Sequence, residues 1–134
     1  MKINKKALFF DIDGTLLEMG KTEITPNMRK ALCSLKQNGI KICIATGRPF
    51  VTIPMFEGVV FDAILAFNGS FCVAGEQVVV KCPIPKEDVK KIIENAKRME
   101  RPVSIATAEE IVANGSDKDL EDYFAIAHHR VNVS

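Results

Sequence analysis

Three short apolar runs in the first half of the chain lack the alternation of apolar and polar residues that marks a half-exposed strand. They cover residues 6–12, 40–45 and 63–67, and the second is rich in β-branched side chains. Runs of this kind are typical of strands that are buried on both faces of a sheet. We therefore expect three core strands in this part of the chain.

A helix is predicted between the first two runs. Thr25 is a good N-cap residue, and Pro26 suits the first helical position. Apolar side chains then recur at helical spacing, and Gly39 stands where a glycine C-cap is expected. A strand, a helix and further strands in this order predict right-handed crossovers and a parallel sheet.

Polar clusters follow each of the three predicted strands. They begin at Asp11, Thr46 and Asn68. Ligands of parallel α/β sheets bind beyond the carboxyl ends of the strands. We therefore expect the three clusters to converge on one edge of the sheet.

The pattern changes after residue 70. Residues 71–73 and 77–82 flank a turn at Gly75 and predict a β-hairpin. Residues 86–100 have one apolar face, with acidic residues near the start and basic residues near the end, and they predict a helix. Residues 103–106 predict another strand.

The last part of the chain carries weaker signals. Ser116 and Asp119 resemble a capping box for a short helix that ends at Tyr123 or Phe124. Residues 130–133 have the pattern of a strand start. The adjacent His128 and His129 do not share a face of a helix or strand, so we expect no metal or catalytic role for them.

Composition and charge narrow the classes of function. The chain has 134 residues, 47% of them hydrophobic and 26% charged, with a net charge of +1. This charge gives no support for binding to nucleic acid or to a membrane surface. The apolar run after the charged N-terminus is too short for a secretory signal, and no stretch approaches the ~20 apolar residues of a membrane span. We expect a cytoplasmic protein with reduced cysteines.

Asp11 and Asp13 are separated by one residue at the end of a predicted strand, and Gly14 follows them. Because the glycine is expected to break the strand, both carboxylates can turn toward one pocket. One could attack phosphorus while the other exchanges protons with the leaving group, and Mg²⁺ would offset their repulsion. An Asp-Gly turn without catalytic function is the alternative interpretation.

Thr46, Gly47 and Arg48 combine a hydroxyl, a glycine that lets backbone amides approach, and a guanidinium. This combination suits a phosphate group, although a simple loop can have the same composition. Asn68 and Gly69 favour a tight turn with positive φ, and a substrate contact is the other interpretation.

Residues 8–16 read LFFDIDGTL, residues 44–48 read IATGR, and residues 67–70 read FNGS. In this order the motifs resemble the haloacid dehalogenase-like hydrolase superfamily, and more narrowly its Cof-type sugar-phosphate phosphatases. The resemblance covers essentially the whole chain.

The resemblance implies an α/β fold with an incomplete Rossmann-like parallel sheet core, a β-hairpin and the first half of an α+β cap domain. Residues 1–82, including the hairpin 71–82, would form the N-terminal half of the hydrolase core. Residues 83–134 would form the partial cap, which in this family closes over the phosphate.

The resemblance also implies the chemistry. Asp11 would be the nucleophile that forms an aspartyl-phosphate, and Asp13 the general acid/base. Mg²⁺ would be held by the Asp11 carboxylate and the Asp13 backbone carbonyl. The substrate would be a small phosphorylated metabolite such as a sugar phosphate. The residues that bind phosphate or substrate would be Gly14, Thr15, Thr46, Gly47, Arg48 and Asn68.

The family pattern continues beyond the cap to a lysine and an Asp-rich loop that no residue of this chain matches. We therefore expect an N-terminal portion of a phosphatase with weak or no activity, or two chains that pair as a homodimer through the exposed edge of the first strand.

Two alternatives to the enzyme remain. One is an inactive module that binds phosphate or Mg²⁺ and acts through protein contacts. The other is a receiver-type phosphoacceptor domain, which would need an Asp after the third strand, where Asn68 stands.

Overall fold

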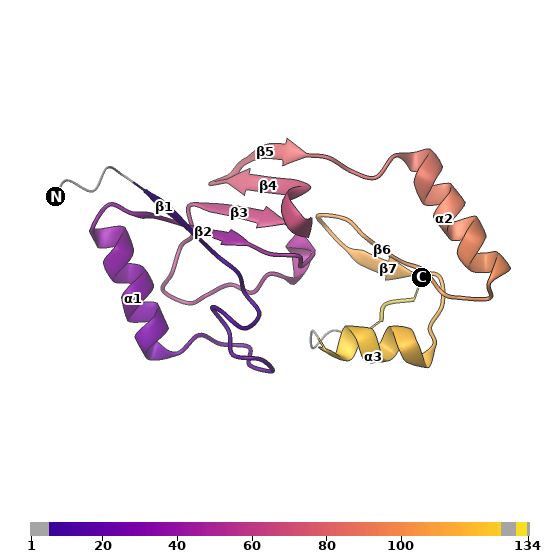
Figure 1. Cartoon of the computed structure of the whole chain (residues 1–134), viewed down its shortest axis with the longest axis horizontal. Coiled ribbons are helices and arrows are strands. Elements are labelled where there is room, and N and C mark those ends of the chain that lie inside the picture. The colour runs from indigo at the N-terminus through magenta and orange to yellow at the C-terminus, as the bar shows by residue number, and fades with distance from the viewer. Residues whose placement is uncertain (1–5, 127–130, 134) are drawn as a thin grey trace. The chain divides into compact units, whose positions relative to one another are not determined.

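The computed structural model describes residues 6–126 and 131–133 (Figure 1). The chain divides into two compact units, Met1–Cys82 and Pro83–Ser134. Among the described residues, no helix has the length and apolar character needed to cross a membrane.

A five-stranded sheet with the order β1-β2-β3-β4-β5 forms the centre of the first unit (Figure 1). Its parallel part confirms the three predicted strands, since β1 pairs with β2 and β2 with β3 in parallel. These strands are β1 (Ala7–Phe10), β2 (Lys41–Ala45) and β3 (Ala63–Ala66).

The predicted hairpin extends this sheet. β4 (Phe71–Ala74) pairs antiparallel with β3, and β5 (Gln77–Lys81) pairs antiparallel with β4. Gly75 lies in the turn at φ 58°, a conformation that glycine adopts at low cost. The sheet as a whole is therefore mixed.

Helix α1 (Pro26–Gln37) begins and ends where the sequence predicts. The Thr25 side chain accepts a hydrogen bond of 3.1 Å from the Met28 amide, and Pro26 occupies the first helical turn. Gly39 follows the helix with φ 76°, and its amide donates to the Lys36 carbonyl. The helix buries Leu32 and makes its main contacts with β2.

The hydrophobic core of the first unit joins the middle of the sheet to the loop after β1 and to helix α1. Ile42 and Ile44 of β2 are 0% and 1% exposed, as expected for a strand with a neighbour on each side. The cluster consists of Ile12, Leu16, Leu17, Ile24, Leu32, Ile42, Ile44, Phe56 and Val59.

Strand β1 contradicts the expectation of a strand that is buried on both faces. Leu8 is 39% exposed and Phe9 is 56% exposed. The reason is that β1 lies at the edge of the sheet, where β2 is its one neighbour among the residues that the structure describes. Its free edge agrees with the exposed edge expected from the family pattern, while pairing of two chains through this edge stays a prediction.

The second unit holds α2 (Lys86–Arg98), which confirms the predicted helix, and an antiparallel pair of strands, β6 (Ser104–Ala106) and β7 (Ile111–Ala113). The sequence predicts β6 but misses β7. The turn between them is closed by Thr107, whose Oγ1 accepts hydrogen bonds from the amides of Glu109 and Glu110.

Helix α3 (Lys118–Ile126) corrects the predicted cap and end. Asp117, not Ser116, caps the helix, because its carboxylate accepts a hydrogen bond of 2.9 Å from the Leu120 amide. Ser116 instead donates to the Glu121 carboxylate at 2.8 Å. Arg130, His128 and His129 lie outside the described residues, and Val133 forms a single bridge to Ala113.

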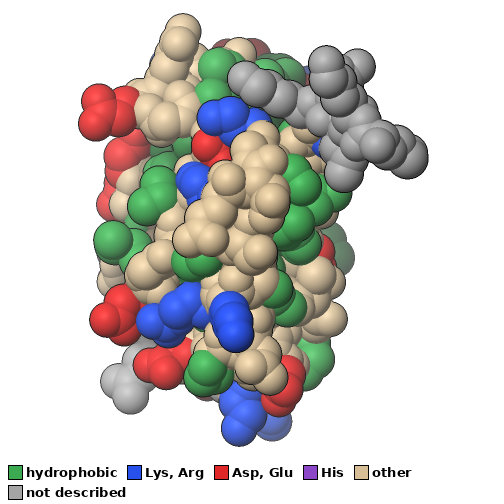
Figure 2. Space-filling model, turned by 90° about the vertical axis from the view of Figure 1, so that its left-hand side faces the viewer, with side chains coloured by type: hydrophobic (Ala, Val, Ile, Leu, Met, Phe, Trp, Pro, Cys, Tyr) green, Lys and Arg blue, Asp and Glu red, His purple; other side chains and the backbone are tan. Residues whose placement is uncertain are grey.

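Charged side chains of both signs are visible on the face of the molecule shown in Figure 2. On the face shown in Figure 2, acidic and basic side chains are interspersed with hydrophobic ones rather than gathered by sign. This distribution matches the small net charge of +1.

A partly buried polar contact holds the residue before β3 against β2. The Asp62 carboxylate accepts hydrogen bonds from the Ile42 amide at 3.0 Å and from Lys41 at 3.2 Å, and Lys36 lies 3.4 Å away. Burial by itself would raise the pKa of Asp62, but the Ile42 amide and the two lysines outweigh it and lower that pKa below its ordinary value.

The first prediction concerns Asp62→Asn. We expect this variant to lose about 1 kcal/mol of unfolding free energy at neutral pH, because the side chain is largely buried but its lysine partners are partly screened by solvent. Since the folded-state pKa lies below the unfolded value of ~3.9, the contribution is present above that value and is lost as pH falls through the folded-state pKa.

Urea denaturation at neutral and at acidic pH measures this effect. Asp88→Asn is the matched control, since Asp88 is an exposed helix residue paired with Lys91. A difference between wild type and Asp62→Asn that does not shrink in acid would contradict the electrostatic explanation.

Candidate active site

The loops after β1, β2 and β3 meet at the carboxyl ends of these strands. The parallel register pairs Phe10 with Ile44, and Ile44 with Ile64, so the residues that follow the strands emerge at the same edge. An open pocket of about 530 Å³ lies there. It is lined by Asp11, Ala45, Thr46, Gly47, Leu65, Asn68 and Gly69.

The loop after β1 turns sharply and alternates between core and solvent. Ile12 is fully buried, while its neighbours Asp11 and Asp13 are exposed. Gly14 has φ 81° and its amide donates to the Leu17 carbonyl at 2.8 Å, so the glycine lies within the turn. The strand itself already ends at Phe10, ahead of both acids, and not at the glycine as predicted. The buried Ile12 thus anchors two exposed carboxylates.

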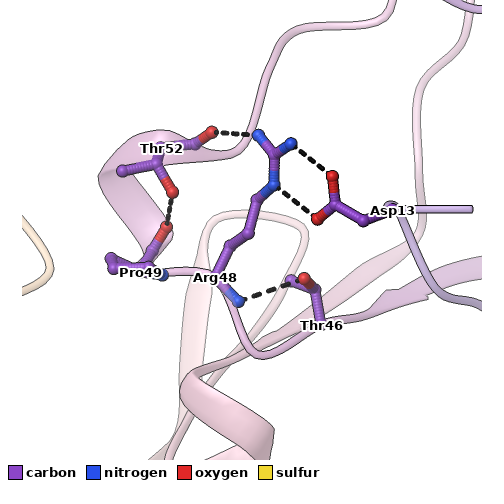
Figure 3. Close-up of polar contacts among 5 residues, drawn as sticks. All are labelled: Asp13, Thr46, Arg48, Pro49 and Thr52. Atoms are coloured by element: carbon purple, nitrogen blue, oxygen red, sulfur yellow. Dashed lines mark hydrogen bonds and ion pairs between the residues drawn. The ribbon is translucent and has the colours of Figure 1, made fainter. Parts of the chain in front are cut away.

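Arg48 binds Asp13 through two hydrogen bonds, with Nε 2.8 Å and Nη2 2.6 Å from the two carboxylate oxygens (Figure 3). This bidentate geometry is the strongest form of an ion pair between side chains. The Arg48 side chain is only 15% exposed and the Asp13 side chain 46% exposed. The hydrogen bonds from Arg48 outweigh burial and lower the pKa of Asp13, so this carboxylate is ionised at neutral pH.

Thr46 is the buried polar residue of the pocket, at 5% exposure. Its Oγ1 accepts a hydrogen bond of 3.1 Å from the Arg48 amide, and its own amide donates to the Leu65 carbonyl at 2.9 Å. Because a hydroxyl both donates and accepts, accepting from Arg48 leaves the O–H group able to donate to a ligand.

The loops after β2 and β3 are tied together by their backbones. The Asn68 amide donates to the Thr46 carbonyl and the Phe67 amide to the Arg48 carbonyl, both at 3.0 Å. Phe67 has φ 49° and Asn68 has φ 55°, a conformation that is costly for a bulky residue such as phenylalanine. Phe67 was expected to end the third strand; it instead begins the short helix η2 (Phe67–Gly69).

The structure brings together most of the predicted site residues. Asp11, Thr46, Gly47 and Asn68 line the pocket. Asp13 and Arg48 form a pair in the adjoining loops and are not among its lining residues. The amides of Gly14 and Thr15 donate to Leu17 and Ile12 within the turn.

Three lining residues, Ala45, Leu65 and Gly69, were not among the predicted site residues. Ala45 is the last residue of β2 and Leu65 the last but one of β3. Their place at the carboxyl end of a predicted strand was the signal in the sequence that could have found them.

The site offers oxygen donors for the implied Mg²⁺. The described residues hold no group of three or more His, Cys, Asp or Glu side chains that could bind a metal ion. Mg²⁺ needs fewer protein ligands, because it is usually held by one or two carboxylates together with water and substrate phosphate. A pocket with the Asp11 carboxylate and neighbouring oxygen donors fits this pattern and does not fit a zinc site.

The family model for haloacid dehalogenase-like hydrolases matches residues 8–133. The chain belongs to this family. Among curated proteins of Bacillus subtilis (strain 168), the chain is 31% identical over 116 residues to the protein named "Putative phosphatase YkrA". This match covers 86% of the chain and 45% of YkrA.

A second relative from the same organism is YitU, a 5-amino-6-(5-phospho-D-ribitylamino)uracil phosphatase. It is 36% identical over 73 residues, a match that covers 53% of this chain and 27% of YitU. The chain therefore spans less than half the length of these curated relatives.

Solved structures agree with these matches. BT1666, a phosphatase from Bacteroides thetaiotaomicron, has a TM-score of 0.81 at 31% identity, with 97% of this chain and 49% of that chain covered. BT4131, a subclass IIB sugar phosphatase, has a TM-score of 0.78 at 28% identity, with 98% and 52% covered. Together these matches confirm the superfamily and the Cof-type branch that the motifs resemble.

The second prediction concerns the contact between Gly47 and Asn68. A Cβ atom added at Gly47 would lie 3.1 Å from Asn68 Oδ1, which is closer than ordinary packing allows. Both residues are exposed, so the Asn68 side chain can give way in part, and we expect Gly47→Ala to lose at most about 1 kcal/mol of unfolding free energy.

A second substitution, Asn68→Gly, removes the crowding atom and keeps the positive φ accessible. The Gly47→Ala/Asn68→Gly double variant should therefore lose less than the sum of the single variants in a denaturation cycle. Gly115→Ala is the matched control, because an added Cβ there meets only an ordinary contact of 3.8 Å to Pro102. Equal losses at Gly47 and Gly115 would refute the crowding.

Proposed function

We propose that this chain provides the nucleophile and the phosphate-binding part of a magnesium-dependent phosphomonoester hydrolase. The observation that carries this proposal is the pocket at the ends of β1 and β2, where the Asp11 carboxylate faces the same space as Thr46 and Gly47. Membership in the haloacid dehalogenase-like family supports it.

Asp11 is the proposed nucleophile. It lines the pocket and lies at the surface, so a phosphate group can reach its carboxylate. An oxygen of Asp11 would attack phosphorus, the bond between phosphorus and the ester oxygen would break, and an aspartyl-phosphate would form. Water would then release phosphate from Asp11.

Asp13 is the proposed general acid/base. It would exchange protons with the leaving ester oxygen in the first step and with the attacking water in the second. Because its pairing with Arg48 keeps Asp13 ionised at neutral pH, Asp13 must take up a proton before it can give one to the leaving oxygen. Asp13 follows Asp11 in the same loop, and the buried Ile12 between them keeps the two acids close. Asp13 is not among the residues that line the pocket.

Thr46 and Gly47 are the proposed binding residues for the phosphoryl oxygens. The Thr46 hydroxyl retains a proton to donate, and Gly47 has no side chain to keep the phosphate from the backbone. Asn68 can add an amide on the same side of the pocket. Gly14 and Thr15, whose amides are used within the turn, would shape the loop rather than bind phosphate through those amides.

The Asp11 carboxylate and the Asp13 backbone carbonyl would hold Mg²⁺. The ion would supply positive charge that offsets the phosphate and the two carboxylates.

The proposed substrate is a small phosphomonoester such as a sugar phosphate. Two relatives support this class: YitU is named for a phosphorylated ribitylamino compound, and BT4131 is a sugar phosphatase. Residues 83–134 would form part of a cap domain that selects the substrate.

The third prediction tests the enzyme directly with an aryl phosphate. We expect the wild-type chain to release phosphate faster with Mg²⁺ than without it. Asp11→Asn should lose at least about a hundredfold in rate, because an amide is a poor nucleophile. Asp88→Asn, an equivalent change at an exposed position of α2, should behave as wild type.

A second measurement follows the intermediate. Labelled phosphate should attach to wild type and Asp88→Asn and not to Asp11→Asn, and hydroxylamine should release it as expected for an acyl phosphate. Equal background rates in wild type and Asp11→Asn, with no label bound, would eliminate the enzyme and favour an inactive module.

A further inference from the structure

The guanidinium of Arg48 is occupied by protein groups rather than directed at the pocket. Nε and Nη2 bind the two oxygens of Asp13 at 2.8 and 2.6 Å, and Nη1 donates to the Thr52 carbonyl at 3.2 Å (Figure 3). Each of the three nitrogens therefore has a partner. The seven residues that line the pocket do not include Arg48.

The backbone of Arg48 is held as firmly as its side chain. Its amide donates to Thr46 Oγ1 at 3.1 Å, and its carbonyl accepts from the Phe67 amide at 3.0 Å. The carbonyl that anchors Nη1 belongs to the short helix η1 (Phe50–Thr52), in which Thr52 Oγ1 donates to the Pro49 carbonyl at 2.8 Å. Hydrogen bonds of the Arg48 backbone and of its side chain thus together hold the guanidinium in place.

We propose that Arg48 is a positioning residue: its guanidinium, bound to the Thr52 carbonyl in η1, holds the Asp13 carboxylate in place. The phosphate is then bound by Thr46 and Gly47 and not by Arg48. Arg48 and Asp13 are 35 positions apart in the chain. The two parallel hydrogen bonds between the guanidinium and the carboxylate fix both the position and the orientation of the Asp13 carboxylate. A lone exposed carboxylate next to Asp11 would instead turn freely and repel an incoming phosphate.

This proposal rests on the proposed phosphate site, and it differs from a direct role in a measurable way. An arginine that binds phosphate should be indispensable for affinity. An arginine that positions Asp13 should be dispensable for affinity once Asp13 is neutralised as well, because removing both groups preserves the local charge.

The first experiment reports on the surroundings of the Asp13 carboxylate, without substrate or metal. NMR at neutral pH records the side-chain carboxyl carbon resonances of Asp13 and Asp62 in wild type, Arg48→Gln and Arg48→Lys. We expect the Asp13 resonance to shift in Arg48→Gln and to return partway in Arg48→Lys, which keeps the charge but not the fork. Asp62, which pairs with Lys36 and Lys41, is the internal control and should not move.

An unchanged Asp13 resonance in Arg48→Gln would overturn the proposal. Circular dichroism establishes that each variant is folded. If Arg48→Gln does not fold, Arg48→Lys serves as the comparison, and an Asp13 resonance identical to wild type in that variant would also overturn it.

The second experiment measures the affinity for inorganic phosphate by titration calorimetry in the presence of Mg²⁺. We expect Thr46→Val to weaken binding at least about tenfold, and Asp13→Asn/Arg48→Gln to stay within about threefold of wild type. A loss in the double variant as large as that in Thr46→Val would identify Arg48 as a phosphate ligand and refute the proposal.

The two experiments separate two kinds of failure. If wild type binds no phosphate, the proposed phosphate site fails, and the resonance of Asp13 still decides whether Arg48 positions it.

Discussion

The parallel pairing of β1 with β2 and of β2 with β3 is the constraint on which the candidate site depends. Parallel strands all end at the same edge of a sheet, so the residues that follow them are brought together whatever their separation in the chain. Asp11, Thr46 and Asn68 owe their shared pocket to this arrangement. Backbone hydrogen bonds between the loops after β2 and β3 then fix the positions of these two loops relative to each other.

The hydrophobic core supports the site directly. Ile12 is fully buried between the exposed Asp11 and Asp13, and the buried Leu16 and Leu17 close the same turn. Packing of these three side chains limits the freedom of the loop that carries both acids. Each carboxylate is therefore placed by an apolar neighbour, although neither carboxylate is itself in the core.

Charge balance at the site is uneven. The charge of Asp13 is compensated by a bidentate arginine, whereas the described residues that line the pocket with Asp11 include no lysine or arginine. An electrostatic consequence follows for any phosphate that enters. The repulsion from Asp13 is largely compensated by Arg48, so the charge of Asp11 is the main one that a metal ion would have to offset.

The elements that build this site follow from local patterns in the sequence. Apolar runs marked the three parallel strands, Thr25 and Pro26 marked the start of α1, and glycines marked the turns, because these are local preferences of the backbone and of burial. The motifs around Asp11, Thr46 and Asn68 also indicated the family and the edge of the sheet where function would lie.

Contacts between distant segments could not be predicted in this way. The pairing of Arg48 with Asp13, the left-handed backbone of Phe67 and the exposure of Phe9 have no local signal, since each depends on what another segment of the chain places beside it. The sequence grouped Arg48 with the phosphate-binding residues. Its guanidinium pairs with Asp13 because the fold brings the loop after β1 within reach, and a bidentate ion pair is more favourable than a free charge on the mostly buried Arg48 side chain.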